Sequence, residues 1–285
     1  MIKVAALQMR SGMDVGRNVA EFERLVREAV AAGAAYVQSP EMTGALVRDR
    51  ASLMAKIKPE ADDPVSAKAA ELAIELGIHV HVGSTAIARP DGKVANRSFL
   101  FSPDGSLVAT YDKIHMFDVD LDKGESWRES ATYEPGKQTV IAELPFAKLG
   151  LAVCYDLRFP QLFRAQALAG AEVLTVPAAF TRQTGEAHWH VLLRARAIEN
   201  GAFVIAAAQG GKHEDGRETF GHSMIVDPWG RIVAEADHDE PAVVLAEIDP
   251  AASADARRKI PNLKNARDFE VSVAQPVAEP ERRAV

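Results

Sequence analysis

Cys154 is the only cysteine among the 285 residues of the chain, and it ends the apolar run that starts at Leu149. One thiol can form neither an internal disulfide nor a thiolate metal site by itself. It is therefore either a small buried side chain or a nucleophile. A free thiol is only a few per cent ionised near neutral pH, so a cysteine nucleophile needs a base or a positive charge beside it.

Two side chains that could supply this help follow other apolar segments. Glu41 lies in Ser-Pro-Glu-Met after one expected strand, and Lys113 lies in Tyr-Asp-Lys-Ile-His after another. Ligand-binding groups gather at strand ends in α/β sheets, so we expect Glu41 and Lys113 at neighbouring strand ends, close to Cys154. The carboxylate would take the thiol proton, and the ammonium would favour the thiolate and a developing oxyanion. Spacing alone leaves a second interpretation open, a solvated Glu41–Lys113 pair and a core cysteine.

Short apolar runs alternate with amphipathic segments along the whole chain, which predicts an α/β fold whose strands are buried on both faces. Asn18 and Glu21 match a capping box for the first helix. With no linker or repeat, the chain is expected to form one domain over residues 1–270, followed by a tail at 271–285 that is loosely ordered or docked on a partner subunit. Helices are predicted at 18–32, 66–76, 160–169 and 189–200, and strands at 3–9, 35–39, 79–82, 96–102, 107–112, 148–153, 173–176, 203–208, 223–226, 231–234 and 243–248.

Composition excludes several classes of protein. Apolar residues at 47% and charged residues at 26% are typical of a globular chain. A net charge of −7 offers no basic surface for nucleic acid. The longest strongly apolar stretch, residues 202–208, is far shorter than the roughly 20 residues of a membrane helix, and the N-terminus lacks a signal-peptide pattern. We therefore expect a soluble, cytoplasmic protein without nucleic-acid or membrane partners.

Five segments resemble, in the same order, motifs of the nitrilase (carbon–nitrogen hydrolase) superfamily, and the resemblance covers roughly residues 2–268. It implies an αββα four-layer sandwich, assembled into homodimers or larger homo-oligomers through which the four layers continue to eight. It implies no metal and no cofactor. The segments are Ser-Pro-Glu at Glu41, Tyr-Asp-Lys-Ile-His at Lys113, Gly-Leu-Ala-Val-Cys-Tyr-Asp-Leu-Arg-Phe-Pro at Cys154, Pro-Ala-Ala-Phe at Pro177, and His222-Ser with the later Asp-Pro-Trp-Gly.

The same resemblance implies a mechanism of amide hydrolysis. Glu41 is the general base, Cys154 attacks the carbonyl carbon, and Lys113 stabilises the tetrahedral oxyanion. The backbone N–H of Tyr155 is implied as the second oxyanion donor. Ammonia leaves, and water activated by Glu41 then hydrolyses the thioester.

Many of these sites contain a second glutamate that hydrogen-bonds the lysine. Glu129, in Arg-Glu-Ser, matches it best, and Glu125 is the competing candidate.

The residues after Cys154 are similar to the Nit-type amidases, whereas nitrilases usually carry Cys-Trp-Glu and N-carbamoyl amidohydrolases often carry Cys-Asn-Asp-Arg-Arg. Residues 192–200, 206–213 and 221–224 resemble the branch acting on deaminated glutathione more than the omega-amidases acting on α-ketoglutaramate. The implied substrate is a small anionic amide. Arg158 could bind its α-keto carboxylate with paired hydrogen bonds, or could instead form an ion pair with Asp156 or another acidic residue. Phe180 and Thr184 match the pocket wall, with core packing and a turn as their alternative roles.

The histidines are expected to be structural. His188 and His190 lie two apart where a helix is expected to begin, so they point in different directions, and His115 and His222 are expected to be network or core residues. A function of another class, an inactive binding scaffold or a thiol sensor, is disfavoured. All three triad residues are present, and a sensor commonly needs a resolving cysteine.

Overall fold

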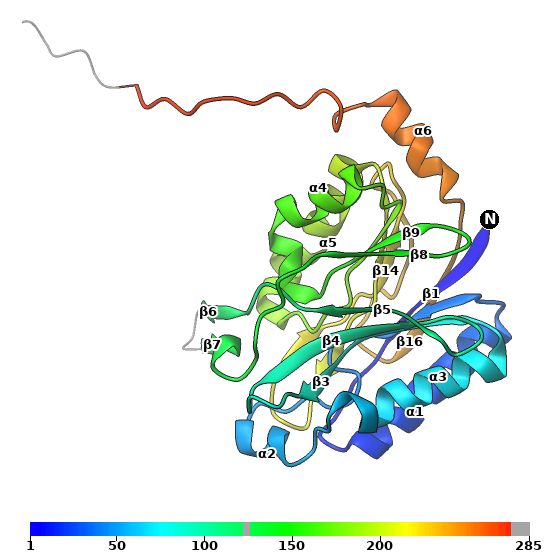
Figure 1. The fold of residues 1–285 in the computed structure, drawn as a ribbon, viewed down its shortest axis with the longest axis vertical. Helices are drawn as coiled ribbons and strands as arrows, with labels where there is room; N and C mark the ends of the chain where they lie inside the picture. Colours follow the sequence, from blue (N-terminus) through cyan, green and yellow to red (C-terminus); the bar gives the residue numbers. More distant parts are fainter. Residues whose placement is uncertain (122–125, 275–285) are drawn as a thin grey trace, which may run out of the picture.

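The computed structural model describes residues 1–121 and 126–274, and within them two six-stranded sheets lie face to face (Figure 1). In spatial order the first sheet contains β16 (Ala242–Ile248), β1 (Ile2–Gln8), β2 (Tyr36–Gln38), β3 (His79–Ala88), β4 (Val94–Phe101) and β5 (Leu107–Asp112). The second contains β15 (Ile232–Glu235), β14 (Met224–Val226), β11 (Phe203–Ala206), β10 (Val173–Thr175), β9 (Lys148–Leu151) and β8 (Val140–Glu143).

Helices cover the outer face of each sheet. α1 (Val15–Ala31) and α3 (Pro64–Leu76) lie on the first sheet, and α4 (Pro160–Leu168) and α5 (Arg182–Asn200) lie on the second (Figure 1). Alternate residues of β1 show the layering, since Ala5 and Leu7 pack with the buried side of α1 and α3, whereas Val4 and Ala6 pack into the core between the sheets. The αββα sandwich predicted from the family resemblance is therefore confirmed.

Smaller elements extend from the ends of the sheets. They include α2 (Arg50–Met54), the ribbon of β6 (Asp118–Asp120) with β7 (Ser126–Arg128), the ribbon of β12 (Gly210–Lys212) with β13 (Glu218–Phe220), α6 (Ala251–Lys259), and the 3₁₀ turns η1 (Glu60–Asp62), η3 (Glu129–Ala131) and η4 (Cys154–Arg158). Two of these turns, η3 and η4, carry residues that the sequence placed in the site.

The predicted start of the first helix is wrong. α1 begins at Val15, and Asp14 caps it by accepting a hydrogen bond from the backbone N–H of Arg17 at 2.9 Å. Asn18 lies inside the helix, where its side-chain oxygen accepts from the N–H of Gly12 and its amide donates to the carbonyl of Gly44. The asparagine therefore joins two loops, and the aspartate four residues earlier satisfies the helix end.

α5 also starts earlier than predicted, at Arg182. Its first turn contains Gly185, which weakens the helical pattern of the sequence. A Cβ atom at this position would lie 2.3 Å from the Cβ of Phe220, so the glycine allows the helix to approach β13 closely.

Within residues 1–121 and 126–274, no helix combines the length and the apolar character needed to cross a membrane. After α6 the chain runs away from the sandwich (Figure 1). The predicted domain boundary at residue 270 and the docking of the tail stay predictions, and residues 275–285 lie outside the described residues.

Candidate active site

The structure brings Glu41, Lys113 and Cys154 together between the two sheets. Glu41 follows β2, Lys113 follows β5 directly, and Cys154 begins η4 after β9. All three are buried, with 4%, 2% and 7% of each residue exposed. The alternative of a solvated surface pair for Glu41 and Lys113 is therefore wrong.

Lys113 lies between two carboxylates. Its Nζ donates to Glu41 Oε1 at 2.9 Å and to Glu129 Oε2 at 2.8 Å. Glu129 Oε2 also accepts from the backbone N–H of Phe117 at 2.6 Å, which fixes the second carboxylate. Glu129 thus occupies the position expected of the second glutamate, whereas its competitor Glu125 lies outside the described residues.

Asn96 on β4 is a part of this site that the sequence analysis missed. Its Nδ2 donates to Glu41 Oε1 at 2.9 Å and to Glu129 Oε1 at 3.2 Å. β3 and β4 separate β2 from β5 in the sheet, so the expectation that Glu41 and Lys113 lie at neighbouring strand ends is wrong. Asn96, on the intervening β4, hydrogen-bonds both carboxylates that pair with Lys113. Asn96 is followed by Arg97 and Ser98 in β4, so the sequence did not single it out.

The protonation of the site follows from burial and neighbouring charge. Burial acts to raise the pKa of Glu41, but Lys113 and hydrogen bonds from Cys154, Lys113 and Asn96 outweigh it and lower that pKa. Burial and then the negative Glu41 raise the pKa of Cys154 well above its ordinary value. Burial alone would lower the pKa of Lys113, yet Glu129 and Glu41 raise it well above its ordinary value. The resting site thus contains a carboxylate, an ammonium and a neutral thiol that line one cavity.

The backbone around Cys154 is strained in a way that presents the thiol. Cys154 has φ +51°, in the left-handed region that favours glycine, and its N–H donates to the carbonyl of Pro177 at 2.9 Å. Within the described residues the next backbone N–H, that of Tyr155, has no hydrogen-bond partner. An N–H directly after a nucleophile is well placed to bind an oxyanion.

Asp156 holds this turn against the segment that carries Lys113. Its buried carboxylate accepts from the N–H of Val153 and the hydroxyl of Tyr111 through Oδ2, at 2.8 and 2.7 Å. Oδ1 accepts from the backbone N–H of His115 at 3.0 Å, and His115 Nδ1 lies 2.7 Å away. The alternative pairing of Arg158 with Asp156 is therefore wrong, and His115 is a network residue as predicted.

A cavity of about 240 Å³ opens beside Cys154. Arg158, Phe180 and Thr184, the three predicted substrate-binding residues, all line it. The guanidinium of Arg158 lies 5.3 Å from the ring of Phe180, and its NH1 is 3.3 Å from His188 Nδ1. Within the described part of the chain it has no carboxylate partner, so it is available to an anionic ligand.

Elsewhere on the wall the guanidinium of Arg48 lies 4.7 Å from the ring centre of Trp127. Among residues 1–121 and 126–274 it too has no carboxylate partner. Arg217 lies 4.9 Å from the same ring, but it is paired with Asp215 at 2.8 Å. Among the described residues, the cavity thus offers two guanidinium groups without a carboxylate partner, Arg48 and Arg158.

The carbon–nitrogen hydrolase family profile matches residues 3–258 of this sequence. The chain belongs to the carbon–nitrogen hydrolase family. It is 41% identical to a deaminated glutathione amidase of Yersinia enterocolitica over 93% of this chain and 92% of that protein. It is 35% identical to omega-amidase NIT2 of Danio rerio over 95% and 96% of the two chains. The NitFhit protein of C. elegans superposes with a TM-score of 0.86 at 33% identity over 93% of this chain, which spans 65% of that protein.

As a carbon–nitrogen hydrolase, the chain acts on carbon–nitrogen bonds, and the geometry is suited to nucleophilic acyl transfer. A neutral thiol and an ionised carboxylate that can take its proton line the same cavity, together with a fixed ammonium, and the backbone N–H of Tyr155 follows the thiol directly.

Proposed function

We propose that this carbon–nitrogen hydrolase is a cysteine amidase with Glu41, Lys113 and Cys154 as its catalytic triad. The placement of a neutral thiol and an ionised, lysine-paired carboxylate on the wall of one cavity carries the proposal. Glu41 takes the thiol proton as Sγ bonds to the carbonyl carbon, and the carbonyl π electrons move to oxygen. Lys113 Nζ and the N–H of Tyr155 stabilise that oxyanion.

The tetrahedral intermediate then collapses to a thioester. Glu41 gives its proton to the amide nitrogen, the C–N bond breaks and the amine leaves. Water next loses a proton to Glu41 and attacks the thioester carbonyl. The C–S bond breaks, the carboxylic product leaves, and the sulfur of Cys154 regains its proton from Glu41. Glu129 positions Lys113 throughout.

The proposed substrate is deaminated glutathione, an anionic amide with one carboxylate beside its keto group and another on its glycine. Arg158 and Arg48 stand at different parts of the cavity wall, which suits two carboxylates. The name of the Yersinia relative supports the same choice. The amide nitrogen of this substrate belongs to cysteinylglycine, so its leaving group is the dipeptide amine instead of the ammonia expected from the sequence.

A second candidate is an omega-amidase acting on α-ketoglutaramate, as the name of the Danio relative suggests. That substrate has one carboxylate and releases ammonia. It would engage Arg158 and leave Arg48 unused. The homodimer and the cytoplasmic location remain predictions.

The test compares the wild-type protein with Cys154→Ala on deaminated glutathione, α-ketoglutaramate, an N-carbamoyl amino acid and a simple nitrile. Deaminated glutathione has no primary amine and its product has one, so amine labelling follows its turnover, while ammonia release follows the others. We expect highest kcat/KM for deaminated glutathione and loss of turnover in the variant. Unchanged turnover in Cys154→Ala would refute the mechanism, and preference for the carbamoyl compound would refute the substrate.

Iodoacetamide labelling separates the amidase from an inactive scaffold. We expect the native protein to be labelled at Cys154 and to lose turnover in parallel, with substrate protecting both. A thiol that reacts without loss of turnover would contradict the proposed role of Cys154.

A further inference from the structure

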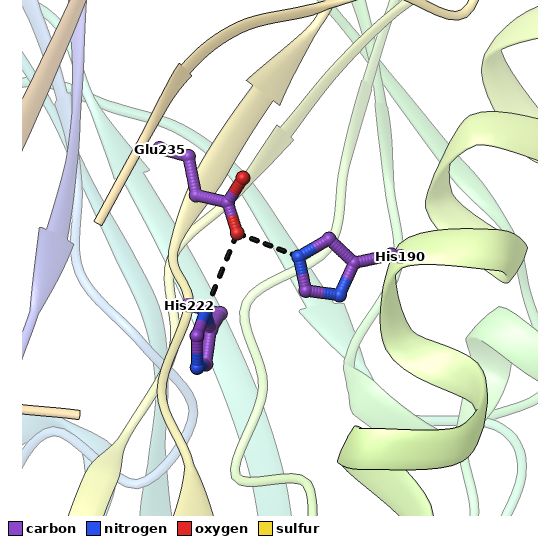
Figure 2. A group of neighbouring side chains, drawn as sticks. All are labelled: His190, His222 and Glu235. Atoms are coloured by element: carbon purple, nitrogen blue, oxygen red, sulfur yellow. Dashed lines mark hydrogen bonds and ion pairs between the residues drawn. The ribbon is translucent and has the colours of Figure 1, made fainter. Parts of the chain in front are cut away.

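A second group of chemically active side chains lies outside the cavity, where α5 meets the β14–β15 hairpin. His190 comes from α5, His222 precedes β14, and Glu235 ends β15. Both imidazoles point at one carboxylate oxygen, with His190 Nε2 2.6 Å and His222 Nδ1 3.3 Å from Glu235 Oε1 (Figure 2). One nitrogen or oxygen atom from each of the three residues lies within 4.8 Å of the other two.

The position of His222 is fixed by strain and by packing. Its φ of +55° lies in the left-handed region, and only Met42 and Cys154 share this feature among the described non-glycine residues. The carbonyl of His222 accepts from Trp189 Nε1 at 2.8 Å, and its ring stacks on Phe220 with centres 4.1 Å apart. Met42 and Cys154 both line the candidate active-site cavity. Backbone strain of this kind concentrates at functional sites, which favours a functional role for His222.

Two imidazoles and one carboxylate form a common zinc ligand set with three protein ligands. Tetrahedral zinc with ligands near 2.0–2.1 Å separates the ligand atoms by about 3.3 Å. His222 Nδ1 already stands at that distance from Glu235 Oε1, and His190 would move away by less than an ångström. The side chains of His190, His222 and Glu235 are 35%, 22% and 21% exposed, which leaves a fourth position open to water.

We propose that His190, His222 and Glu235 form a zinc-binding site that ties α5 to the β14–β15 hairpin. Each imidazole coordinates as the neutral tautomer whose proton is on the other ring nitrogen, and the carboxylate is ionised. α5 also carries Thr184 in the cavity wall, so bound zinc would stabilise the wall from behind. The sequence analysis expected a structural role for His190 and His222, and the proposed site extends that role to binding zinc.

The experiment measures zinc binding by the full-length, metal-stripped protein with a competing chromophoric chelator. We expect one zinc ion per chain and a rise in Tm with added zinc. His190→Gln and Glu235→Gln should each weaken binding at least about tenfold. X-ray diffraction at the zinc edge should place the ion between the three side chains.

Two controls distinguish this site from other ligands on the chain. His238→Ala removes an exposed histidine of the adjoining segment, and Cys154→Ala removes the thiol, so neither should change the zinc affinity. The proposal is overturned if the wild-type protein shows no saturable 1:1 binding, if His190→Gln and Glu235→Gln bind zinc as tightly as the wild type, or if Cys154→Ala abolishes binding.

Discussion

Two carboxylate clusters in this molecule are alike in plan and differ in burial. Glu41 Oε1 accepts from Lys113 and Asn96, and Glu235 Oε1 accepts from His190 and His222. Each cluster also contains or adjoins a non-glycine residue with positive φ. The Glu41 cluster lies between the sheets, whereas the Glu235 cluster reaches solvent at the edge of the second sheet.

Burial decides what each cluster can do. In the buried cluster, removing one partner leaves a buried charge without compensation, which is costly. The charges of Glu41 and Lys113 therefore depend on each other, and the ionised Glu41 is available to accept a proton. Around Glu235, water can replace a lost partner or be displaced by a ligand. The buried cluster is therefore suited to catalysis, and the partly exposed cluster is suited to binding a ligand.

The largest effect is expected from Glu41→Gln, which keeps the shape and removes the base. Turnover of deaminated glutathione should fall by about 10²- to 10⁴-fold. His190→Gln, in the exposed cluster, should leave turnover of the same substrate within about twofold. Steady-state kinetics of the two variants at neutral pH test this difference between the clusters. Equal losses of turnover in the two variants would contradict it.

The same variant sharpens the comparison through pH. The pKa of Glu41 is lower in the folded protein than in the unfolded chain, so its contribution to stability is complete above the ordinary glutamate pKa. It is lost as pH falls through the folded-state value. Urea unfolding from neutral to acid pH should therefore show a steeper loss of free energy for the wild type than for Glu41→Gln, and parallel curves would contradict the lowered pKa.

A matched substitution in both clusters should give the next effect. Glu129→Gln leaves the buried Lys113 with one carboxylate and should reduce the free energy of unfolding by about 3 kcal/mol. Glu235→Gln, measured without metal, should cost about 1 kcal/mol or less because its partners are partly solvated. Urea denaturation gives both values. Similar costs at the two sites would show that burial is not what separates them.

The smallest effect is expected in the cavity wall, outside both clusters. Arg48→Gln should raise KM for deaminated glutathione about tenfold and leave KM for α-ketoglutaramate unchanged, because only the former has a second carboxylate. Arg158→Gln should raise KM for both substrates. An equal effect of Arg48→Gln on KM for the two substrates would show that Arg48 does not bind the second carboxylate. The proposed triad would be unaffected by that result.

Much of the fold and the triad could be predicted because each depends on local pattern. Strand-like runs predicted that Glu41, Lys113 and Cys154 follow strands, and the ordered motifs predicted the sandwich. The role of Asn96 depends on sheet order, which a strand pattern does not contain. The same limit hid the Glu235 cluster, since His190 meets residues 32 and 45 positions later only through the packing of α5 on the hairpin.

The predicted start of α1 was wrong for a different reason. Asp14 and Asn18 are both good capping residues, and only the contacts of Asn18 with two loops decide between them.

Asp156 connects the turn of Cys154 to the strand end of Lys113 through buried hydrogen bonds, while Arg48 reaches the cavity from a loop and Trp127 from the β6–β7 ribbon. The reacting groups and the Arg48 side of the cavity wall therefore have separate structural supports, whereas Arg158 belongs to the same turn as Cys154. Loops at the cavity mouth can diverge or be redesigned to accept another amide while the distance between thiol and ammonium stays fixed. New specificities should accordingly be more accessible by engineering Arg48 and its neighbours than by altering any residue that Asp156 holds.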